Sequence, residues 1–421
     1  MKPGATLAVS RSFWFGRFVA QLQRDGGYAV RDWLQAQGRT LGAELFSGLQ
    51  GRELDLALFQ YGFARPAVSA HGVPVAQRND DADAHGGALF WQFPCRTEAA
   101  AWDVHAPLLQ PRLYDNELHV YLGLPWATWI DKARHSAWGA DGARGMQQQL
   151  QLVGVQMSGL RHALAALGVR LKLHTVCQHI YWFDLLPALQ KLGVTDLWLS
   201  HCPPALATQV SVPPVPMPDL GTVCLHPWAL HAVNVEDPQR RCGLTLGKDV
   251  AQKSVLASFA GAHMPHYLSD IRLRLQNLAN APGFVVHLED DWHFNKVVYG
   301  HQIGGQPLAP APDLDAAVQR YNALLSDSVF ALCPAGAGPN TLRLWEALAV
   351  GAIPVLLGAL PVLPFGGSLA SVDWDRIVLR VPDAQLEQLP LMLASMPLAE
   401  RRERQARGLK AYAAVKVQRC F

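Results

Sequence analysis

The stretch FALCPAGAGPNTLRLWEALAVGAIPVLL, residues Phe330 to Leu357, decides the fold of this chain. It begins with an apolar run, passes through a glycine-rich turn, and then shows the spacing of apolar side chains that predicts a helix. Gly351 and a second apolar run follow. The order strand, turn, helix, strand indicates an α/β protein, because parallel strands need a crossover helix between them.

The glycine-rich turn predicts a phosphate-binding site. Gly336 and Gly338 allow a ligand to approach the backbone closely, and a helix beginning near Pro339 or Asn340 would present N–H groups that suit a diphosphate. The turn is no Walker A loop, because no Lys-Ser/Thr pair follows the second glycine. Thr341 stands where a dinucleotide fingerprint has its third Gly or Ala, so kinase and dehydrogenase functions lose support.

Two charged residues of the predicted helix have two interpretations. Arg343 and Glu346 are three positions apart, so both can project from one helical face. Arg343 would then point toward a phosphate and Glu346 toward ribose hydroxyls. A simple surface ion pair between the two explains the same spacing equally well, and the spacing alone leaves both open.

The same alternation of short apolar runs and amphipathic runs extends outward from this stretch, and it predicts parallel strands covered by helices. Residues 221–248 are expected to be irregular, after a segment (202–218) that contains six prolines. The expected strands cover 119–124, 170–175, 196–200, 254–259, 284–287, 329–332 and 353–357. The expected helices cover 145–167, 267–278, 316–325, 341–350 and 400–417.

Composition limits the class of protein. The chain has 421 residues, of which 50% are hydrophobic and 17% charged, so we expect a well-buried globular protein of two domains. The net charge is +2 without runs of like charge, which argues against a nucleic-acid partner. Seven cysteines without a CxxC motif predict neither a disulfide framework nor a structural zinc site. We therefore expect a cytoplasmic protein.

One uncharged segment has the length of a membrane span. Residues 347–372 contain no charged side chain over 26 positions. Three prolines and four glycines interrupt the segment, so a helix end, a buried strand and a loop explain it better. We expect no transmembrane segment, and contact with the inner face of the cytoplasmic membrane stays open.

The segment YNALLSDSVFALCPAGAGPNTLRLWEALAVGAIPVLL, Tyr321 to Leu357, resembles the C-terminal signature of the exostosin-like glycosyltransferases, family 47. Shorter matches are SVLASFAGA (254–262) and YLSDIRLRL (267–275). VYLGLPWATWIDKAR (120–134) and TVCQHIYWFDLLPALQKLGVTDLWLSHC (175–202) are similar to the other half of bacterial members. The resemblance covers residues 114–360 and indicates the bacterial type of the family.

The resemblance implies a GT-B fold, with two facing Rossmann-like domains and an interdomain cleft. Residues 1–245 would form the acceptor-side domain and residues 246–385 the domain that binds the nucleotide sugar. A helical segment, 386–421, could pack back on the first domain. The implied activity is transfer of a sugar from a nucleotide-sugar donor, UDP- or GDP-linked, to a cell-envelope glycan. The family inverts the anomeric centre, and we expect neither a metal nor a cofactor; a lipid-linked acceptor stays open.

The resemblance also implies roles for individual residues on the donor side. The turn and Arg343 would hold the diphosphate, Glu346 the nucleoside, and Arg272 would be a further phosphate partner. The residues expected to bind the nucleotide sugar are thus Gly336, Gly338, Asn340, Arg343, Glu346 and Arg272.

Glycosyl transfer also requires a base that takes a proton from the acceptor hydroxyl, and this base should lie on the opposite domain. In open α/β sheets ligands bind beyond the C-terminal ends of the strands. His179 follows a predicted strand and is the first choice, because histidine titrates near neutrality. Asp131 and His201 are the alternatives. Each could instead be structural, as a buried hydrogen-bonded histidine or a helix-capping aspartate.

Two other functions remain compatible with the sequence. Another GT-B transferase that uses a CMP- or GDP-linked sugar would share the same plan. A catalytically inactive sugar-binding or scaffold protein could also retain the two-domain shell. Glu289, Asp290 and Asp291 form a local acidic group that we interpret as a solvated loop, not as a metal site.

Overall fold

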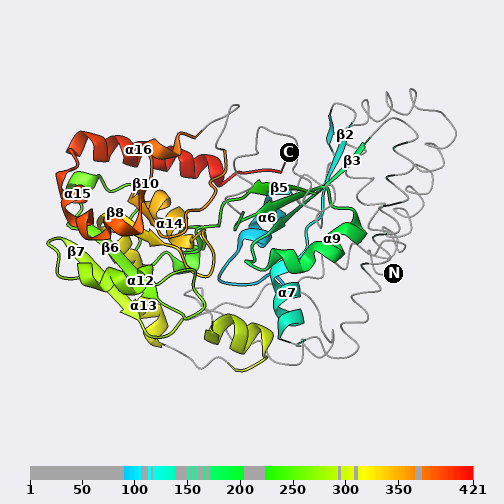
Figure 1. Ribbon diagram of the computed structural model, residues 1–421, viewed down its shortest axis with the longest axis horizontal. Helices are drawn as coiled ribbons and strands as arrows, with labels where there is room; N and C mark the ends of the chain where they lie inside the picture. The colour runs from blue at the N-terminus through cyan, green and yellow to red at the C-terminus, as the bar shows by residue number, and fades with distance from the viewer. Residues whose placement is uncertain are drawn as a thin grey trace.

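The computed structural model of the chain describes most residues from 90 onward. The described residues are 90–105, 112–114, 117–135, 170–202, 223–292, 295–307, 312–365 and 372–420, with single positions 137, 150, 154, 158, 161 and 165. They form two halves, each built around its own five-stranded sheet (Figure 1). Most of the helix expected over 145–167, and all of 203–222, lie outside the described residues.

The first sheet has the strand order β1-β2-β3-β4-β5, with β1 antiparallel to β2 and all other pairs parallel. β3 is buried at six of its eight positions, as expected for a parallel strand that is covered on both faces. The strands are β1 (Arg112–Tyr114), β2 (Glu117–Tyr121), β3 (Arg170–Cys177), β4 (Asp196–Leu199) and β5 (Cys224–Pro227). The accompanying helices are α6 (Thr97–His105), α7 (Trp126–Arg134) and α9 (Leu186–Leu192).

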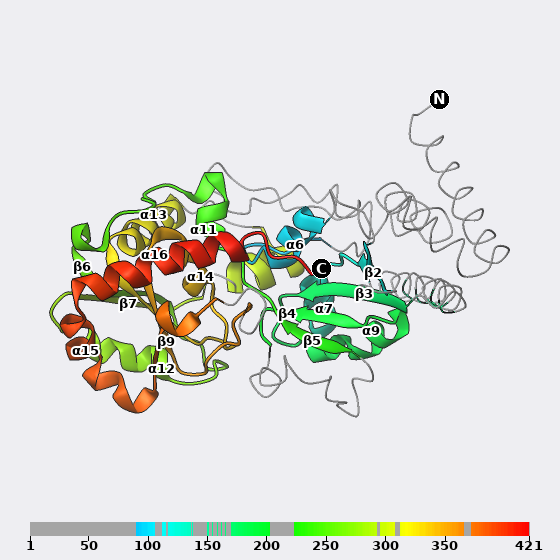
Figure 2. The same ribbon diagram turned by 90° about the horizontal axis from the view of Figure 1, so that it is seen from above.

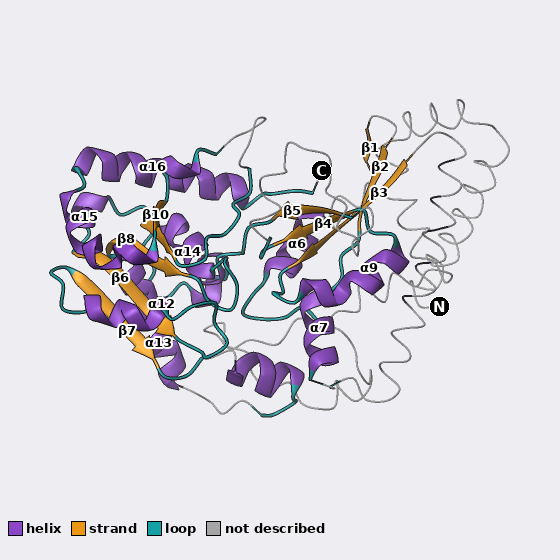
Figure 3. Ribbon diagram, viewed as in Figure 1, coloured by secondary structure: helices purple, strands orange, loops and turns teal. Residues whose placement is uncertain are grey.

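The second sheet is parallel throughout, in the order β10-β9-β8-β6-β7. Its strands are β6 (Val255–Ala262), β7 (Phe284–Glu289), β8 (Ser328–Pro334), β9 (Ile353–Leu357) and β10 (Leu379–Val381). Its helices are α12 (Ile271–Arg274), α13 (Pro312–Ser326), α14 (Leu342–Val350), α15 (Leu389–Ser395) and α16 (Leu398–Val415). The π-helix η5 (Asn295–Ile303) packs against α7 of the first half. Two such halves, each a mainly parallel sheet accompanied by helices, confirm the predicted α/β class (Figure 3).

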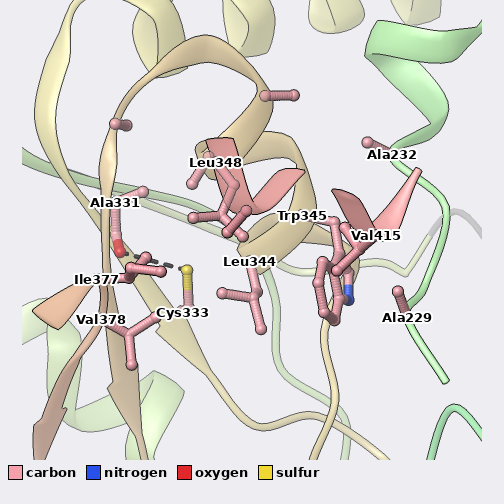
Figure 4. Close-up of a cluster of buried hydrophobic side chains, with 14 of the residues drawn as sticks. Ala229, Ala232, Ala331, Cys333, Leu344, Trp345, Leu348, Ile377, Val378 and Val415 are labelled. Atoms are coloured by element: carbon pink, nitrogen blue, oxygen red, sulfur yellow. Dashed lines mark hydrogen bonds between the residues drawn. The ribbon is translucent and has the colours of Figure 1, made fainter. Parts of the chain in front are cut away.

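The stretch that decides the fold has the predicted form. β8 is buried at all seven positions and β9 at all five, so both strands lie inside the sheet. Between them, α14 ends at Gly351, whose φ of 71° is the left-handed conformation that glycine adopts most easily. Leu344, Trp345 and Leu348 of this helix are fully buried (Figure 4).

The connection between the two sheets packs into the core of the second half. Ala229 and Ala232 belong to the same buried cluster as Trp345 (Figure 4). The expectation that 221–248 is irregular is therefore wrong in part: this segment contains β5 and the short helix α11 (Val233–Glu236). β5 was missed because it is a four-residue edge strand that ends in proline, which is too short to show an alternating pattern.

The C-terminal segment contacts both halves. α16 packs along α14, and the chain beyond it runs to the first sheet (Figure 2). There the side chain of Gln418 accepts a hydrogen bond from the amide of Ala229, and the amide of Cys420 donates to Nε2 of His105. The predicted boundaries at 245 and 385 stay predictions.

Residues 347–372 form the end of α14, then β9 and a loop, where they are described. Within the described part of the chain, no helix combines the length and the apolar character that a bilayer crossing requires.

Candidate functional site

The strand order of the second sheet reverses at β6. The chain passes from β6 to β7 on one side and then returns to β8 on the other side. In open parallel sheets, the crevice at the carboxyl ends of the two strands beside such a reversal is where ligands bind. The carboxyl end of β6 leads into the loop before α12, and that of β8 leads into the glycine-rich turn before α14. The topology therefore points to the same turn that the sequence indicated.

Arg272, on α12, spans the ends of these two strands. Its Nη1 donates to the carbonyl of Ala262 at 2.8 Å, and its Nε donates to that of Ala335 at 3.0 Å. Burial and the nearby Arg343 lower the pKa of Arg272 to about 10, so the guanidinium stays charged at neutral pH. The side chain is thus a positive charge fixed at the predicted crevice.

Arg343, on α14, lies beside Arg272. Its guanidinium packs over the ring of Phe259 at 4.4 Å, its Nη2 donates to the carbonyl of Ala260, and its Nε is buried without a partner. The alternative of an ion pair with Glu346 is not realised. Within the described residues neither arginine forms a salt bridge, so two positive charges stand together without a carboxylate, an arrangement that favours an anionic ligand.

Glu346 turns away from this pair and is fully engaged within the protein. Its Oε1 accepts from the backbone N–H of Asn234 at 3.2 Å and from Nδ2 of the same residue at 2.8 Å. Its Oε2 accepts from the hydroxyl of Tyr321 at 2.7 Å, and burial raises the pKa of Glu346. The carboxylate joins α14 to α11 and α13. These bonds hold the carboxylate inside the protein, and the predicted nucleoside contact stays a prediction.

The glycine-rich turn lies between Arg272 and the first half of the molecule. A Cβ on Gly336 would lie 2.9 Å from Nη2 of Arg272, and one on Gly338 would lie 2.3 Å from Nδ1 of His201. A side chain at position 338 would thus collide with His201 and Ile180, whereas one at position 336 would displace the end of Arg272. The amide of Gly336 donates to the carbonyl of Gly338 at 3.1 Å, so it is used inside the turn. The arginines, more than this amide, supply the positive charge.

Asn340 holds the turn against the first half. Its Nδ2 donates to the carbonyl of Ser200 at 2.8 Å, and its Oδ1 accepts from Nε1 of Trp345 at 3.1 Å. Its side chain is thereby bound to protein groups on both sides. The structure thus joins the carboxyl end of β4 to that of β8, so the strand ends of the two sheets face each other.

The three candidate bases come together at the carboxyl ends of β3 and β4. Nε2 of His179 lies 3.2 Å from Oδ1 of Asp131, which is buried on α7. Nδ1 of His179 accepts from the amide of Tyr181 at 3.1 Å, and Oδ2 of Asp131 accepts from Nε2 of Gln92. Burial and the neighbouring His179 lower the pKa of His201 to about 3, so His201 is neutral at physiological pH.

Comparison with known proteins shows what the second half resembles. Residues 230–396 match the family model described as "Exostosin GT47 domain". Residues 230–396 therefore resemble an exostosin GT47 domain. The glycine-rich turn and both arginines lie inside the matched residues, whereas the three candidate bases lie outside them. The assignment to the bacterial type of the family stays a prediction.

Curated relatives match short parts of this chain. The probable glucuronosyltransferase GUT1 of Oryza sativa subsp. japonica is 37% identical over 79 residues, which are 19% of this chain and 18% of that protein. Exostosin-1 of Drosophila melanogaster is 40% identical over 81 residues, 19% of this chain and 10% of that protein. The probable beta-1,4-xylosyltransferase IRX10 of Arabidopsis thaliana is 36% identical over 70 residues, 17% of this chain and 16% of that protein. The match thus covers less than a fifth of the length of each relative.

Solved structures are more distant. Trehalose 6-phosphate synthase from Burkholderia multivorans aligns with a TM-score of 0.34 at 14% identity, covering 71% of this chain and 82% of that one. The pneumococcal O-GlcNAc transferase GtfA, in complex with UDP and GlcNAc, aligns with a TM-score of 0.29 at 11% identity, covering 62% and 56%. Scores this low carry no argument about the ligand of the exostosin GT47 domain.

One buried acid that the sequence did not single out lies outside the matched domain, beside the candidate bases. Glu98, in the first turn of α6, accepts hydrogen bonds from the amide of Gln178 at 3.0 Å and the amide of Ala127 at 3.2 Å. It joins the end of β3 to the start of α7, the two elements that carry His179 and Asp131. An acidic residue at a helix start is common, so the sequence held no signal for this role.

Glu98 makes stability depend on pH in a predictable direction. Burial raises the pKa of Glu98 to about 8 from its ordinary 4.5, so between these values the folded chain keeps a proton that the unfolded chain has lost. Stability should therefore fall as pH rises through this window, by up to about 1.4 kcal/mol per pH unit. Glu98→Gln cannot ionise, so the free energy of unfolding from urea titrations at pH 5, 6.5 and 8 should fall less steeply in the variant. Parallel curves for the two proteins would contradict the buried acid.

No metal site accompanies these groups in the part of the chain that the structure describes, where no three His, Cys, Asp or Glu side chains are gathered as a metal ion would require. In the acidic group after β7, Asp291 pairs with Lys296 at 2.7 Å, and both side chains are exposed.

Proposed function

We propose that this chain is a glycosyltransferase that moves a sugar from a nucleoside-diphosphate sugar to a glycan acceptor. One observation carries the proposal: two arginines, which have no carboxylate partner in the described part of the chain, lie at the topological switch point of the residues that match the exostosin GT47 model. One of them also has a buried Nε without a partner there. A diphosphate has the charge and the acceptor oxygens that such a pair requires. The names of the curated relatives, which are glucuronosyl- and xylosyltransferases, agree with this class of reaction.

In the proposed mechanism, Arg272 and Arg343 stabilise the leaving group. As the bond between the anomeric carbon and the diphosphate oxygen breaks, negative charge grows on the diphosphate. Donors that are already fixed in place, as both guanidiniums are, stabilise that charge by several kcal/mol without reorganisation.

Asp131 and His179 act on the acceptor side. Because Nδ1 of His179 accepts a hydrogen bond from the amide of Tyr181, the neutral ring carries its proton on Nε2 and donates it to Asp131. His179 therefore has no uncommitted lone pair in this arrangement. We assign proton acceptance to Asp131, with His179 orienting the carboxylate, although the sequence ranked His179 first.

The reaction is then a single displacement at the anomeric carbon, in which one bond forms and one breaks. The acceptor oxygen bonds to the anomeric carbon, its proton passes to Asp131, and the nucleoside diphosphate leaves with the electron pair of the broken bond. Attack from the side opposite the diphosphate inverts the anomeric centre. The proposal also includes inversion of the anomeric centre, independence of a metal, a UDP- or GDP-linked donor, a cell-envelope glycan as acceptor and a cytoplasmic location.

Binding and turnover measured in sequence test the proposal. We expect one of UDP, GDP or CMP to raise the melting temperature of the full chain, because a ligand that binds only the folded state stabilises it. The nucleotide sugars of that base, including those of glucuronic acid and xylose, should then be hydrolysed or transferred to glycan acceptors. If a nucleotide raises the melting temperature but no donor is turned over, the result would favour the inactive sugar-binding protein. If no nucleotide raises the melting temperature, the result would favour the scaffold.

A further inference from the structure

Two polar atoms at the junction of the halves are buried without a partner. Ser200 is 1% exposed, and among the residues that the structure describes neither its Oγ nor Nδ1 of His201 has a hydrogen-bond partner. Both residues follow β4. A buried polar group without a partner destabilises the folded chain, so such groups are rare in native proteins and call for an explanation. A ligand that hydrogen-bonds to them is one explanation.

The position of this pair specifies which part of a ligand it would meet. The turn extends from Gly336, which touches Arg272, to Gly338, which touches His201. A donor whose diphosphate lies on the arginines therefore has His201 beside the other end of the turn.

The candidate base lies beyond the same pair. Cys177 pairs with Leu199 in the sheet, so His179 and His201 follow the ends of two adjacent strands, and His179 contacts Asp131. In a displacement reaction the transferred sugar must lie between the leaving diphosphate and the base. Ser200 and His201 occupy that interval, because they adjoin the turn on one side and His179 on the other.

We propose that Ser200 and His201 bind hydroxyl groups of the transferred sugar and so select the donor. This inference rests on the proposed function. A serine hydroxyl both donates and accepts, and a neutral imidazole offers one donor and one acceptor, which suits uncharged sugar hydroxyls. His201 is neutral because of its lowered pKa, and for the same reason it is a poor proton acceptor. The inference therefore moves His201 from the candidate bases to the sugar site.

Such a site discriminates strongly between sugars. When a protein provides buried groups for a substrate hydroxyl, an analogue that lacks the hydroxyl leaves those groups unpaired. Ser200 and His201 would thus favour donors that place hydroxyls at this point over the corresponding deoxy sugars.

Ser200→Ala tests the inference in the full-length chain. Using the nucleotide identified by the melting-temperature screen, calorimetry would measure the affinity for the nucleoside diphosphate and for its nucleotide sugar. We expect unchanged affinity for the diphosphate and about tenfold weaker affinity for the nucleotide sugar, the loss of one buried hydrogen bond. Stability in urea should be equal to that of the wild type or higher, because the substitution removes an unpaired group.

Ser328→Ala is the matched control. Ser328 is also fully buried, but its Oγ is hydrogen-bonded to the carbonyl of Leu324 at 2.6 Å and to Oγ of Ser258 at 2.7 Å. It lies at the start of β8, the opposite end of the strand from the turn. This variant should be less stable than the wild type and should bind both ligands normally.

Each other outcome is informative. The sugar site is wrong if Ser200→Ala lowers the affinity for both ligands equally, lowers neither affinity, or destabilises the chain as Ser328→Ala does. In each of these cases the proposed function stands. If the wild type binds neither ligand, the proposed function is wrong and the sugar site falls with it.

Discussion

Replacing Arg343 by methionine should weaken binding of the nucleoside diphosphate about 100-fold, because a hydrogen bond to a charged group contributes up to about 3 kcal/mol. Methionine keeps much of the aliphatic volume that packs over Phe259 and removes the charge. Stability should not fall, since the wild-type guanidinium is buried with an unpartnered Nε and without a salt bridge in the described residues. Calorimetric titration and urea unfolding of the same preparation measure both effects.

Arg401→Met is the control for this experiment. Arg401 lies on α16, also has an unpartnered buried Nε, and packs over the ring of Phe330 at 5.7 Å. Its Nη2 donates to the carbonyls of Leu393 and Ala394, not to the strand ends of the proposed site. Nucleotide affinity should be unchanged in this variant. If both variants lose the same affinity for the nucleoside diphosphate, Arg343 acts through general electrostatics and not as a diphosphate ligand.

The fold could be predicted well where the cues are local. The expected ranges 341–350 and 353–357 agree with α14 and β9 to within one residue, because the apolar spacing and Gly351 both lie inside the stretch. The helix start expected near Pro339 or Asn340 was two to three residues too early, since α14 begins at Leu342. β5 and α11 could not be found in this way, since each has four residues and depends on neighbours from other segments. Four residues are too few to establish a period.

The site could be predicted as a set of residues but not as a set of contacts. The rule that ligands bind at strand ends selected His179, His201 and the turn from Gly336 to Asn340 from the sequence, and the structure places them at those ends. The partners of Glu346 could not be foreseen, because Asn234 is 112 positions away in the chain and Tyr321 is 25 away. The same holds for Glu98, which is 80 positions from Gln178.

The roles of the two candidate histidines depend on which ring nitrogen of each is already hydrogen-bonded or buried against the protein. A sequence places a histidine after a strand, but only the packed loop brings the amide of Tyr181 onto Nδ1 of His179. Likewise, only the contact between His201 and Gly338 buries the His201 ring at the junction. The sequence therefore placed His179 first among the three candidates, whereas the tertiary structure favours Asp131. All three candidates still lie in one cluster.

Asp131→Asn should lower kcat about 1,000-fold while leaving the affinity for the nucleotide sugar unchanged. Asparagine keeps an oxygen that can accept from Nε2 of His179, but it cannot take a proton, and general base catalysis contributes about 100- to 10,000-fold. His179→Gln should lower kcat less, because glutamine can still donate to the carboxylate. Single-turnover transfer assays with saturating donor separate this step from binding.

Asp184→Asn is the control for the loss of an aspartate in the same domain. Asp184 forms a partly exposed ion pair with Arg134 at 2.8 Å, and such pairs contribute less than about 1 kcal/mol to stability, so kcat should stay near the wild-type value. If Asp131→Asn keeps full activity while His179→Gln loses it, the proton passes to His179, and the bond from Tyr181 to Nδ1 must open when the acceptor binds. If both variants keep full activity, the base lies elsewhere, and the proposed Asp131–His179 pair is structural.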